Sequence, residues 1–264
     1  MKLNIRNEYD NLKKVLLAPV ADEYLNQQEE LITLFKKYQV KVMKTSPCKN
    51  AKYQMFVRDP FIVIKDKIIL CKMKDEIRKQ ELNTIKKLLK EINPSNIIKT
   101  DDGVFLEGGD VIVHNDIIFV GQNGERTNKQ GVDFLKKHFS DKYRIIPLNM
   151  INPNSYIPWI HLDCLFNPIS IDTAILYAGG FDKETIKKIN KLFPNQIVVN
   201  KKEQEQLATN LISLGKNTVI MQNRHKRLIN RLEKLGFRVE KVHNYNTIKE
   251  IGFNRCLTCP LERN

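Results

Sequence analysis

Polar residues that could do chemistry stand at the heads of several short apolar stretches. They are Arg58 and Asp59, Glu107 and Asp110, His161 and Asp163, and, near the end of the chain, Cys256. Several carboxylates gathered in one partly desolvated cavity repel one another and would take up protons unless a cation joined them. That cation could be a metal ion. It could also be an organic group such as a guanidinium, whose five N–H donors form a fork that matches carboxylates in pairs.

The stretch FLEGGDVIV, residues 105–113, shows this pattern most clearly. Two glycines at the head of an apolar strand lower its strand propensity, so they are expected where the backbone must approach another group closely. A metal site would have to be assembled from scattered single ligands, because the HxxxH, HExxH and EF-hand patterns are all missing. An organic cation is the other candidate for the space between the carboxylates.

Such residues need elements that bring them together, and the chain repeats one pattern that does so. A short apolar strand leads to a second strand, a helix and a third strand, in five units of roughly 45 residues. The expected helices lie at residues 25–38, 76–92, 128–139, 183–193 and 225–236, and the polar turns KD, HND and SID separate paired strands. Because the units diverge in sequence, a closed ring is favoured over an open solenoid, and the strand starts would converge at its centre.

Composition and charge argue against several other classes of protein. The formal charge is +14, but the lysines are spread along the chain at helical spacing without any nucleic-acid-binding motif, so nucleic-acid binding is not expected. No stretch approaches the ~20 apolar residues of a membrane span, and MKLNIRNEYDNLKKV lacks the apolar run of a secretory signal. The five cysteines are expected to be reduced thiols in a cytoplasmic protein.

Five motifs follow one another along the chain: FVRDPF, EGGDV, GERTN, HLD and RCLTCPL. In this order they resemble the guanidino-modifying, or pentein, superfamily, which includes arginine deiminases, dimethylarginine dimethylaminohydrolases and amidinotransferases. The resemblance covers nearly the whole chain. It implies an α/β fold, a five-bladed propeller of ββαβ repeats with pseudo-fivefold symmetry, formed by residues 1–264 as a single catalytic domain without metal or cofactor.

The resemblance also implies a role for each candidate residue. Cys256 would be the nucleophile that attacks the guanidinium carbon. His161 would protonate the departing amine and then deprotonate the water that hydrolyses the covalent thiouronium intermediate. The carboxylates of Asp59 and Glu107 would hold the guanidinium N–H groups, and Asp163 would be a third acceptor.

Further residues are implied around the rest of the substrate. Arg78 and Arg126 each lie nineteen residues after a guanidinium-binding acid, where arginines of the family bind the substrate carboxylate, so they would form a bidentate clamp. Phe56 would pack on the aliphatic stem, and Asp110 would shape the turn beside the substrate. The chain departs from the family at Tyr53, where deiminases and dimethylargininases usually have Asn or Asp.

The favoured function is a hydrolase that cleaves a C–N bond of a guanidino amino acid, converting arginine to citrulline and ammonia. Asp163 favours arginine, because dimethylargininases typically lack this acid and a carboxylate buried against methyl groups would be penalised. A dimethylargininase, an amidinotransferase with an amine acceptor, and a catalytically silent pentein that binds a guanidino compound or a protein are the alternatives. The expected partner is a small guanidino amino acid, and a homo-oligomer is compatible with the sequence.

The cysteines of RCLTCPL and the arginine of FVRDPF also have simpler interpretations. Cys256 and Cys259 form a CxxC, the pattern of a redox pair or of half a zinc site, but no second CxxC accompanies it. Arg58 is expected to pair with a neighbouring acid rather than to contact the substrate.

Overall fold

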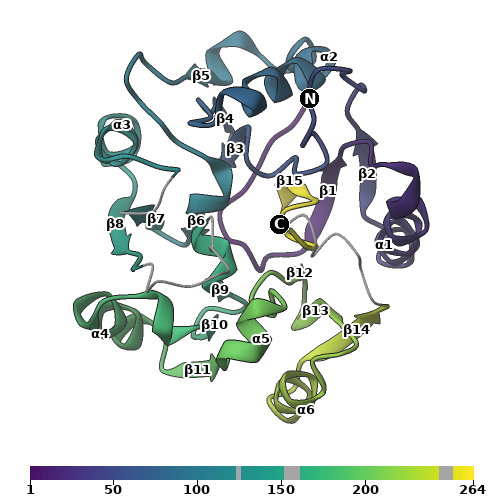
Figure 1. Ribbon diagram of the computed structural model, residues 1–264. Helices are drawn as coiled ribbons and strands as arrows, with labels where there is room; N and C mark the ends of the chain where they lie inside the picture. Colours follow the sequence, from purple (N-terminus) through teal and green to yellow (C-terminus); the bar gives the residue numbers. More distant parts are fainter. Residues whose placement is uncertain (123–125, 152–160, 244–251) are drawn as a thin grey trace.

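The chain folds into five small sheets with helices packed around them. The computed structural model describes residues 1–122, 126–151, 161–243 and 252–264. Each sheet has three strands, and in Figure 1 the sheets lie around a common centre with the longer helices on the outside. This is a mixed α/β fold built from the predicted alternation of strands and helices.

Four of the sheets share one topology. Two strands form an antiparallel hairpin, and a third strand returns to pair in parallel with the second strand of that hairpin. The predicted hairpins at KD, HND and SID are confirmed, and Lys65 and Asn115 adopt the left-handed conformation that such tight turns require. Along the chain these sheets contain β3 (Phe61–Ile64), β4 (Lys67–Leu70) and β5 (Ile97–Lys99); β6 (Val111–His114), β7 (Ile117–Gln122) and β8 (Arg144–Asn149); β9 (Phe166–Pro168), β10 (Thr173–Leu176) and β11 (Asn195–Val198); and β12 (Ile212–Gly215), β13 (Thr218–Gln222) and β14 (Arg238–Val242).

The remaining sheet joins the two ends of the chain. Its central strand β1 (Leu12–Leu17) pairs in parallel with β2 (Lys41–Lys44) and antiparallel with β15 (Cys259–Arg263), the last strand. The last strand, which begins within NRCLTCPLE, therefore completes the first unit, because that unit has only β1 before its helix where the other units have two strands. This pairing brings the C-terminal turn that carries Cys256 next to residues from the first quarter of the chain.

Four longer helices lie between the second and third strands of their sheets, as the apolar periodicity predicts. They are α1 (Leu25–Lys37), α3 (Lys129–Phe139), α4 (Lys183–Leu192) and α6 (Lys226–Lys234), and two short helices, α2 (Lys86–Leu89) and α5 (Lys201–Glu205), accompany them. Polar caps fix where α3 and α4 begin, because the side chains of Asn128 and Asp182 accept hydrogen bonds from backbone N–H groups of the first turn.

The segment expected to be one helix at residues 76–92 has a different geometry. It is the 3₁₀ helix η2 (Glu76–Ile85), followed by the single turn of α2. In a 3₁₀ helix, side chains three residues apart lie on one face. Arg78, Glu81 and Thr84 have this spacing and are all buried. The buried side of η2 therefore carries a polar row beside the apolar Ile85, and an apolar periodicity does not reveal such a row.

Short 3₁₀ turns stand directly before two of the hairpins. Glu107 flanks the N-terminus of η4 (Gly108–Asp110), which leads into β6, and His161 flanks η5 (Leu162–Cys164), which leads into β9. The two turns occupy equivalent places in successive units and contact each other. The other short turns are η1 (Asp22–Tyr24), η3 (Pro94–Asn96) and η6 (Ala178–Gly180).

Apolar side chains fill the interior between sheets and helices. Phe119, Phe166 and Phe193 meet in edge-to-face and tilted contacts with ring centroids 5.4 to 6.0 Å apart, at the junction of the β6 and β9 sheets with α4.

Within the described ranges, no helix is both long and apolar enough to span a membrane.

Candidate active site

His161 and Glu107 form a buried hydrogen-bonded pair. The Nε2 atom of His161 lies 2.8 Å from Oε2 of Glu107, and neither side chain is exposed beyond a few per cent. The other carboxylate oxygen of Glu107 accepts a hydrogen bond of 3.0 Å from the backbone N–H of Lys74. The imidazole and the carboxylate are therefore fixed relative to each other.

Asp59 lies on the other side of the imidazole and holds Arg78. Its Oδ1 atom is 3.7 Å from Nδ1 of His161, and its Oδ2 accepts a 2.9 Å hydrogen bond from Nη1 of Arg78. Nε and Nη2 of Arg78 each donate to the carboxylate of Glu81 at 2.8 Å. The Arg78 guanidinium thus lies buried among carboxylates, 3.9 Å from Glu107.

The charges of this cluster shift the pKa values of its members. Burial disfavours the imidazolium, but the Asp59 carboxylate and the hydrogen bond to Glu107 outweigh it and raise the pKa of His161 to about 10. Burial would raise the pKa of Glu107, yet His161 and Arg78 hold it below its usual value. Burial dominates at Glu81, whose pKa rises to about 7 despite Arg78. An imidazolium facing carboxylates is therefore the form present at neutral pH.

The glycine pair of FLEGGDVIV allows the closest backbone approach in the site. A Cβ on Gly108 would stand 2.0 Å from the carbonyl oxygen of Arg58, and the Gly108 N–H donates to the carbonyl of Asp59 at 2.8 Å. A Cβ on Gly109 would stand 2.6 Å from Cγ of His161. The expected close approach is present, and in this structure it is made to the Arg58–Asp59 backbone and to the imidazole.

Asp110 ties the two turns together. Its Oδ1 accepts a hydrogen bond of 2.9 Å from the backbone N–H of Leu162, and its Oδ2 accepts one of 2.6 Å from the hydroxyl of Thr127. Burial raises the pKa of Asp110 to about 7, against the opposing effects of His161 and the Thr127 bond. These contacts shape η4 and hold η5 against it.

Asp163 faces a buried group of arginines. Nε of Arg255 lies 3.3 Å from its Oδ2, and Nη1 of Arg255 donates to Oε2 of Glu8 at 2.7 Å. Arg58 reaches the same Glu8 oxygen at 3.9 Å, which is the kind of pairing with an acid that the sequence favoured. Burial raises the pKa of Asp163, although Arg255 and His161 oppose that shift.

Cys256 lies in a buried turn just before β15, and three contacts place this turn beside the acids and the imidazole. The Cys256 carbonyl accepts a 3.3 Å hydrogen bond from the N–H of Arg58. The preceding Arg255 pairs with Asp163, which lies two residues after the histidine. Hydrogen bonding to Cys256, together with burial, raises the pKa of the Cys164 thiol well above its usual value.

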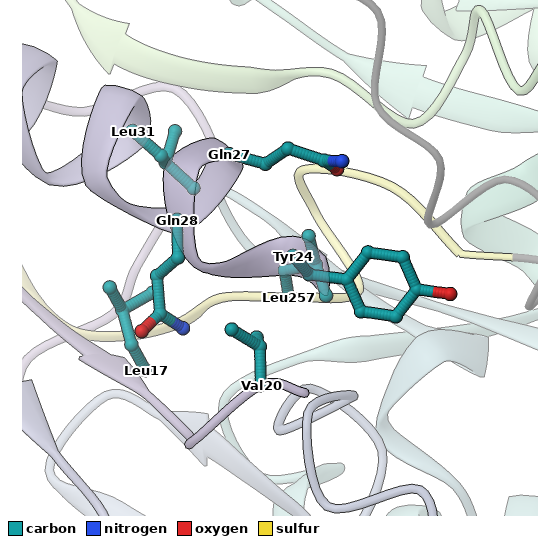
Figure 2. A pocket seen from close by; sticks show the side chains of 7 residues that line it. All are labelled: Leu17, Val20, Tyr24, Gln27, Gln28, Leu31 and Leu257. Atoms are coloured by element: carbon teal, nitrogen blue, oxygen red, sulfur yellow. The ribbon is translucent and has the colours of Figure 1, made fainter. Parts of the chain in front are cut away.

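An apolar wall lies next to the thiol of Cys256. Phe56 packs there with Tyr24, Met55 and Leu257, and Tyr53 lies against the same cluster. Figure 2 shows the small cavity behind this wall, where Tyr24 and Leu257 line it together with residues of β1 and α1. Gly252 lies so close to Phe56 that a Cβ there would be 2.0 Å from the ring. The wall fixes the ring of Phe56 close to the thiol.

The structure brings the seven predicted acid, histidine, cysteine and phenylalanine residues into one region, and it places the two arginines differently from each other. Arg78 is buried, and its donors go to Asp59 and Glu81. Nη1 of Arg126 lies 3.6 Å from Asp75 and 4.0 Å from Glu107, with part of the side chain exposed. Gly124 and Glu125 of the GERTN motif lie outside the described residues. A carboxylate clamp by both arginines stays a prediction.

Sequence reasoning missed five residues that contact the site: Glu8, Glu81, Thr127, Asn210 and Arg255. Arg255 and Thr127 belong to the motifs RCLTCPL and GERTN, so their positions could have been found there. Glu81 lies three residues after Arg78 on η2, a spacing that could have indicated their pairing, whereas Glu8 and Asn210 show no local pattern because each reaches the site from another part of the chain.

Comparison with known proteins accounts for this arrangement. The family model described as N,N dimethylarginine dimethylhydrolase, eukaryotic, matches residues 6–261. The chain belongs to this family, within the pentein superfamily. The superfamily suggested by the ordered motifs is therefore confirmed.

Relatives of this pentein include characterised and uncharacterised proteins. YkgA, an uncharacterised protein of Bacillus subtilis (strain 168), is 30% identical over 238 residues, which span 90% of this chain and 80% of the relative. The N-terminal domain of ArgZ, a cyanobacterial arginine dihydrolase, has a TM-score of 0.84 at 19% identity, covering 96% of this chain and 98% of that chain. SxtG, an amidinotransferase of Microseira wollei, has a TM-score of 0.82 at 19% identity, covering 99% and 97%. At such identities the two structures show the fold.

Proposed function

We propose that this pentein hydrolyses a C–N bond of a guanidino amino acid, with arginine as the substrate. Two buried carboxylate oxygens carry the proposal. Asp59 Oδ1 and Asp163 Oδ2 are buried and accept no hydrogen bond from any described residue, although a cationic group faces each of them, His161 Nδ1 at 3.7 Å and Arg255 Nε at 3.3 Å. A buried polar atom left without a partner costs about 1–3 kcal/mol, and a guanidinium offers N–H donors in a fork that suits paired carboxylates.

The reaction uses Cys256 and His161 in two steps. The Cys256 thiolate attacks the guanidinium carbon, and the C–N bond to the departing amine breaks as His161 gives that amine its proton. The raised pKa of His161 supports this order, because the group is protonated when the substrate arrives. His161 then accepts a proton from the water that attacks the thiouronium carbon. The C–S bond breaks, and the ureido product and the thiolate are released.

The proposal includes the assembly that holds these groups. We propose that the five sheets form a five-bladed α/β propeller with pseudo-fivefold symmetry, acting as a single catalytic domain. The pairing of the first and last strands, β1 and β15, supports a closed ring. The equivalent places of Glu107 and His161 before successive hairpins support the repeat.

The preference for arginine rests on Asp163. A buried carboxylate oxygen that accepts no hydrogen bond, as Asp163 Oδ2 does beside the Arg255 guanidinium, suits unmethylated nitrogens, which offer N–H donors, and it would be penalised against methyl groups. A second candidate is hydrolysis of asymmetric dimethylarginine, because the matching family model bears that activity in its description.

The test is to measure kcat/KM for arginine and for asymmetric dimethylarginine, quantifying citrulline, ammonia and dimethylamine. We expect arginine to be preferred, with citrulline and ammonia formed in equal amounts. Cys256→Ser should abolish turnover because a hydroxyl is far less ionised than a thiol, whereas the control Cys259→Ser should retain it. Quenched wild-type reactions should carry a covalent adduct on Cys256 in mass spectrometry.

Other outcomes discriminate the alternatives. A clear preference for the dimethylated substrate would favour the second candidate, and ornithine formed together with an amidinated amine would indicate amidino transfer. Loss of turnover in Cys259→Ser but not in Cys256→Ser would show that the nucleophile is misassigned.

A further inference from the structure

Asn210 faces the turn that carries Cys256 and contacts both its backbone and its sulfur. The residue lies two positions before β12 and is fully buried. Its side-chain Oδ1 accepts hydrogen bonds from the backbone N–H groups of Arg255 at 3.0 Å and Cys256 at 3.2 Å. Its Nδ2 donates to Sγ of Cys256 at 3.2 Å. One side-chain amide therefore binds the N–H groups of two consecutive residues and the thiol of the second residue.

The orientation of this amide is fixed by its partners. The two backbone groups are donors, so only the carbonyl oxygen of the side chain can face them. Rotating the amide by half a turn would set an NH₂ group against two N–H groups and leave the N–H of Cys256 unpaired, while that of Arg255 would keep only its 3.3 Å bond to the backbone carbonyl of Asn210. The NH₂ of Asn210 is consequently directed at the sulfur.

The segment around Asn210 is itself tied to the turn after His161. Nδ2 of Asn167 donates to the carbonyls of Thr209 and Leu211 at 2.9 Å each. The hydroxyl of Thr209 donates to the carbonyl of Cys164 at 2.6 Å. Asn210 is thus held from both sides by bonds that link β12 to β9 and η5. Such support keeps a donor in place without reorganisation during a reaction.

A fixed N–H donor changes the balance between the thiol and the thiolate. A free cysteine is only a few per cent ionised at neutral pH. Hydrogen bonds to the charged form favour it. Two titratable or charged groups in the described part of the chain interact with this thiol. The Cys164 thiol on η5 is hydrogen-bonded to it, and the Arg255 guanidinium in its own turn attracts its negative charge. Among the described residues, Asn210 is the one whose side-chain N–H is directed at the sulfur within hydrogen-bonding distance.

We propose that Asn210 is a positioning residue that fixes Cys256 in its reactive orientation and stabilises its thiolate before any substrate binds. The inference rests on the proposed role of Cys256 as the nucleophile, and it concerns a property of the protein that needs no substrate to be measured.

The test is alkylation of Cys256 by iodoacetamide as a function of pH, without substrate. Trypsin cleaves after Arg255, so tandem mass spectrometry of peptide 256–263 separates Cys256 from Cys259. In Asn210→Asp the carboxylate keeps both backbone bonds but turns a negative oxygen to the sulfur. We expect its alkylation curve to move to higher pH by about one unit, with the rate near neutrality about tenfold lower. Asn210→Ala, which loses the donor and the acceptor, should move the curve in the same direction.

Thr209→Val is the matched control, because it breaks one bond of the same segment without touching the sulfur and leaves in place the two backbone bonds from Asn167 that flank Asn210. It should lower the melting temperature and leave the alkylation curve in place. The proposal is overturned if Asn210→Asp and Asn210→Ala alkylate as the wild type does, or if Thr209→Val moves the curve equally. If the curve moves as expected but the wild type turns over no guanidino compound, the proposed function fails and the role of Asn210 stands.

Discussion

The imidazole of His161 carries its proton at neutral pH because two carboxylates face its two nitrogens. Glu107 binds Nε2 at 2.8 Å and Asp59 lies 3.7 Å from Nδ1, and together they outweigh the cost of burying a cation. A histidine charged in this way can give a proton to a departing amine. Its charge also contributes to the free energy of unfolding, so the same group can be followed without a substrate.

His161→Gln should flatten the pH dependence of stability above neutrality. The pKa of His161 is about 10 in the folded chain against 6.5 for an unperturbed histidine, so its stabilisation is fully present below 6.5 and is lost as the pH rises through 10. Between about pH 7.5 and 9.5, the wild type should lose on the order of 2 kcal/mol that the variant does not lose. This window avoids Asp110 and Glu81, whose pKa values lie at about 7.

Urea unfolding at both pH values measures this difference. His138→Gln changes an exposed histidine, so its free energy of unfolding should fall with pH as that of the wild type does. If the free energy of unfolding of His161→Gln also falls with pH as in the wild type, the imidazole of His161 is neutral in the folded protein.

The 3₁₀ turns η4 and η5 act as a unit that positions the acid–histidine pair. Asp110 on η4 binds the backbone of Leu162 on η5, and Gly109 of η4 lets the two turns approach. Since Glu107 and His161 flank these turns, a change in their spacing moves the carboxylate relative to the imidazole. The site therefore depends on backbone packing as well as on its side chains.

Gly109→Ala should displace His161 and reduce kcat/KM by about a hundredfold, the typical cost of misplacing a catalytic group by an ångström. Its Cβ would stand 2.6 Å from Cγ of the imidazole, while the other side of the ring is held by Glu107. Steady-state kinetics with arginine checks this. Gly179→Ala is the control, because its Cβ would meet the outer end of the Tyr177 ring at 2.8 Å and that end can yield. Full activity in Gly109→Ala would show that the approach of the turns is not needed.

At the scale of the whole molecule, the N-terminal segment holds separate sheets together. Asn4, Ile5 and Asn7 form isolated bridges to Glu262, Lys65 and His114, which lie in or beside three different sheets. Glu8 follows and places its carboxylate between Arg255 and Arg58. Burial opposes ionisation of Glu8, but these arginines lower its pKa to about 2. The first residues of the chain thereby balance the positive charge next to Cys256.

Glu8→Gln should lower the free energy of unfolding by about 3–5 kcal/mol, because it leaves buried guanidinium groups without their counter-charge. The wild type should lose this stabilisation as the pH falls from 4.5 toward 2, since the folded pKa is depressed, and the variant should not. Glu184→Gln removes an exposed partner of Lys188 and should cost no more than about 0.5 kcal/mol. If Glu8→Gln and Glu184→Gln lower the free energy of unfolding equally in urea titrations, other groups must balance the buried charges of Arg58 and Arg255.

The repeat and its helices could be predicted from the sequence because they depend on local periodicity. Apolar spacing and capping residues such as Asn128 and Asp182 set the helices, and polar turns set the hairpins. Residues at the starts of successive units could likewise be placed in one region. The helix expected at residues 76–92 was wrong in type over its first ten residues, which form the 3₁₀ helix η2 with a row of buried polar side chains.

Only the tertiary structure decided which of these residues pair. Arg78 binds Asp59 and Glu81 inside the site, although the family resemblance implied an arginine that binds the substrate carboxylate. Asn210 reaches Cys256 across 46 positions of sequence, and Glu8 reaches Arg255 across 247. The physical reason is that periodicity reports which face of an element is buried, whereas the partner of a buried charge depends on which distant segment the packing of the sheets brings against it.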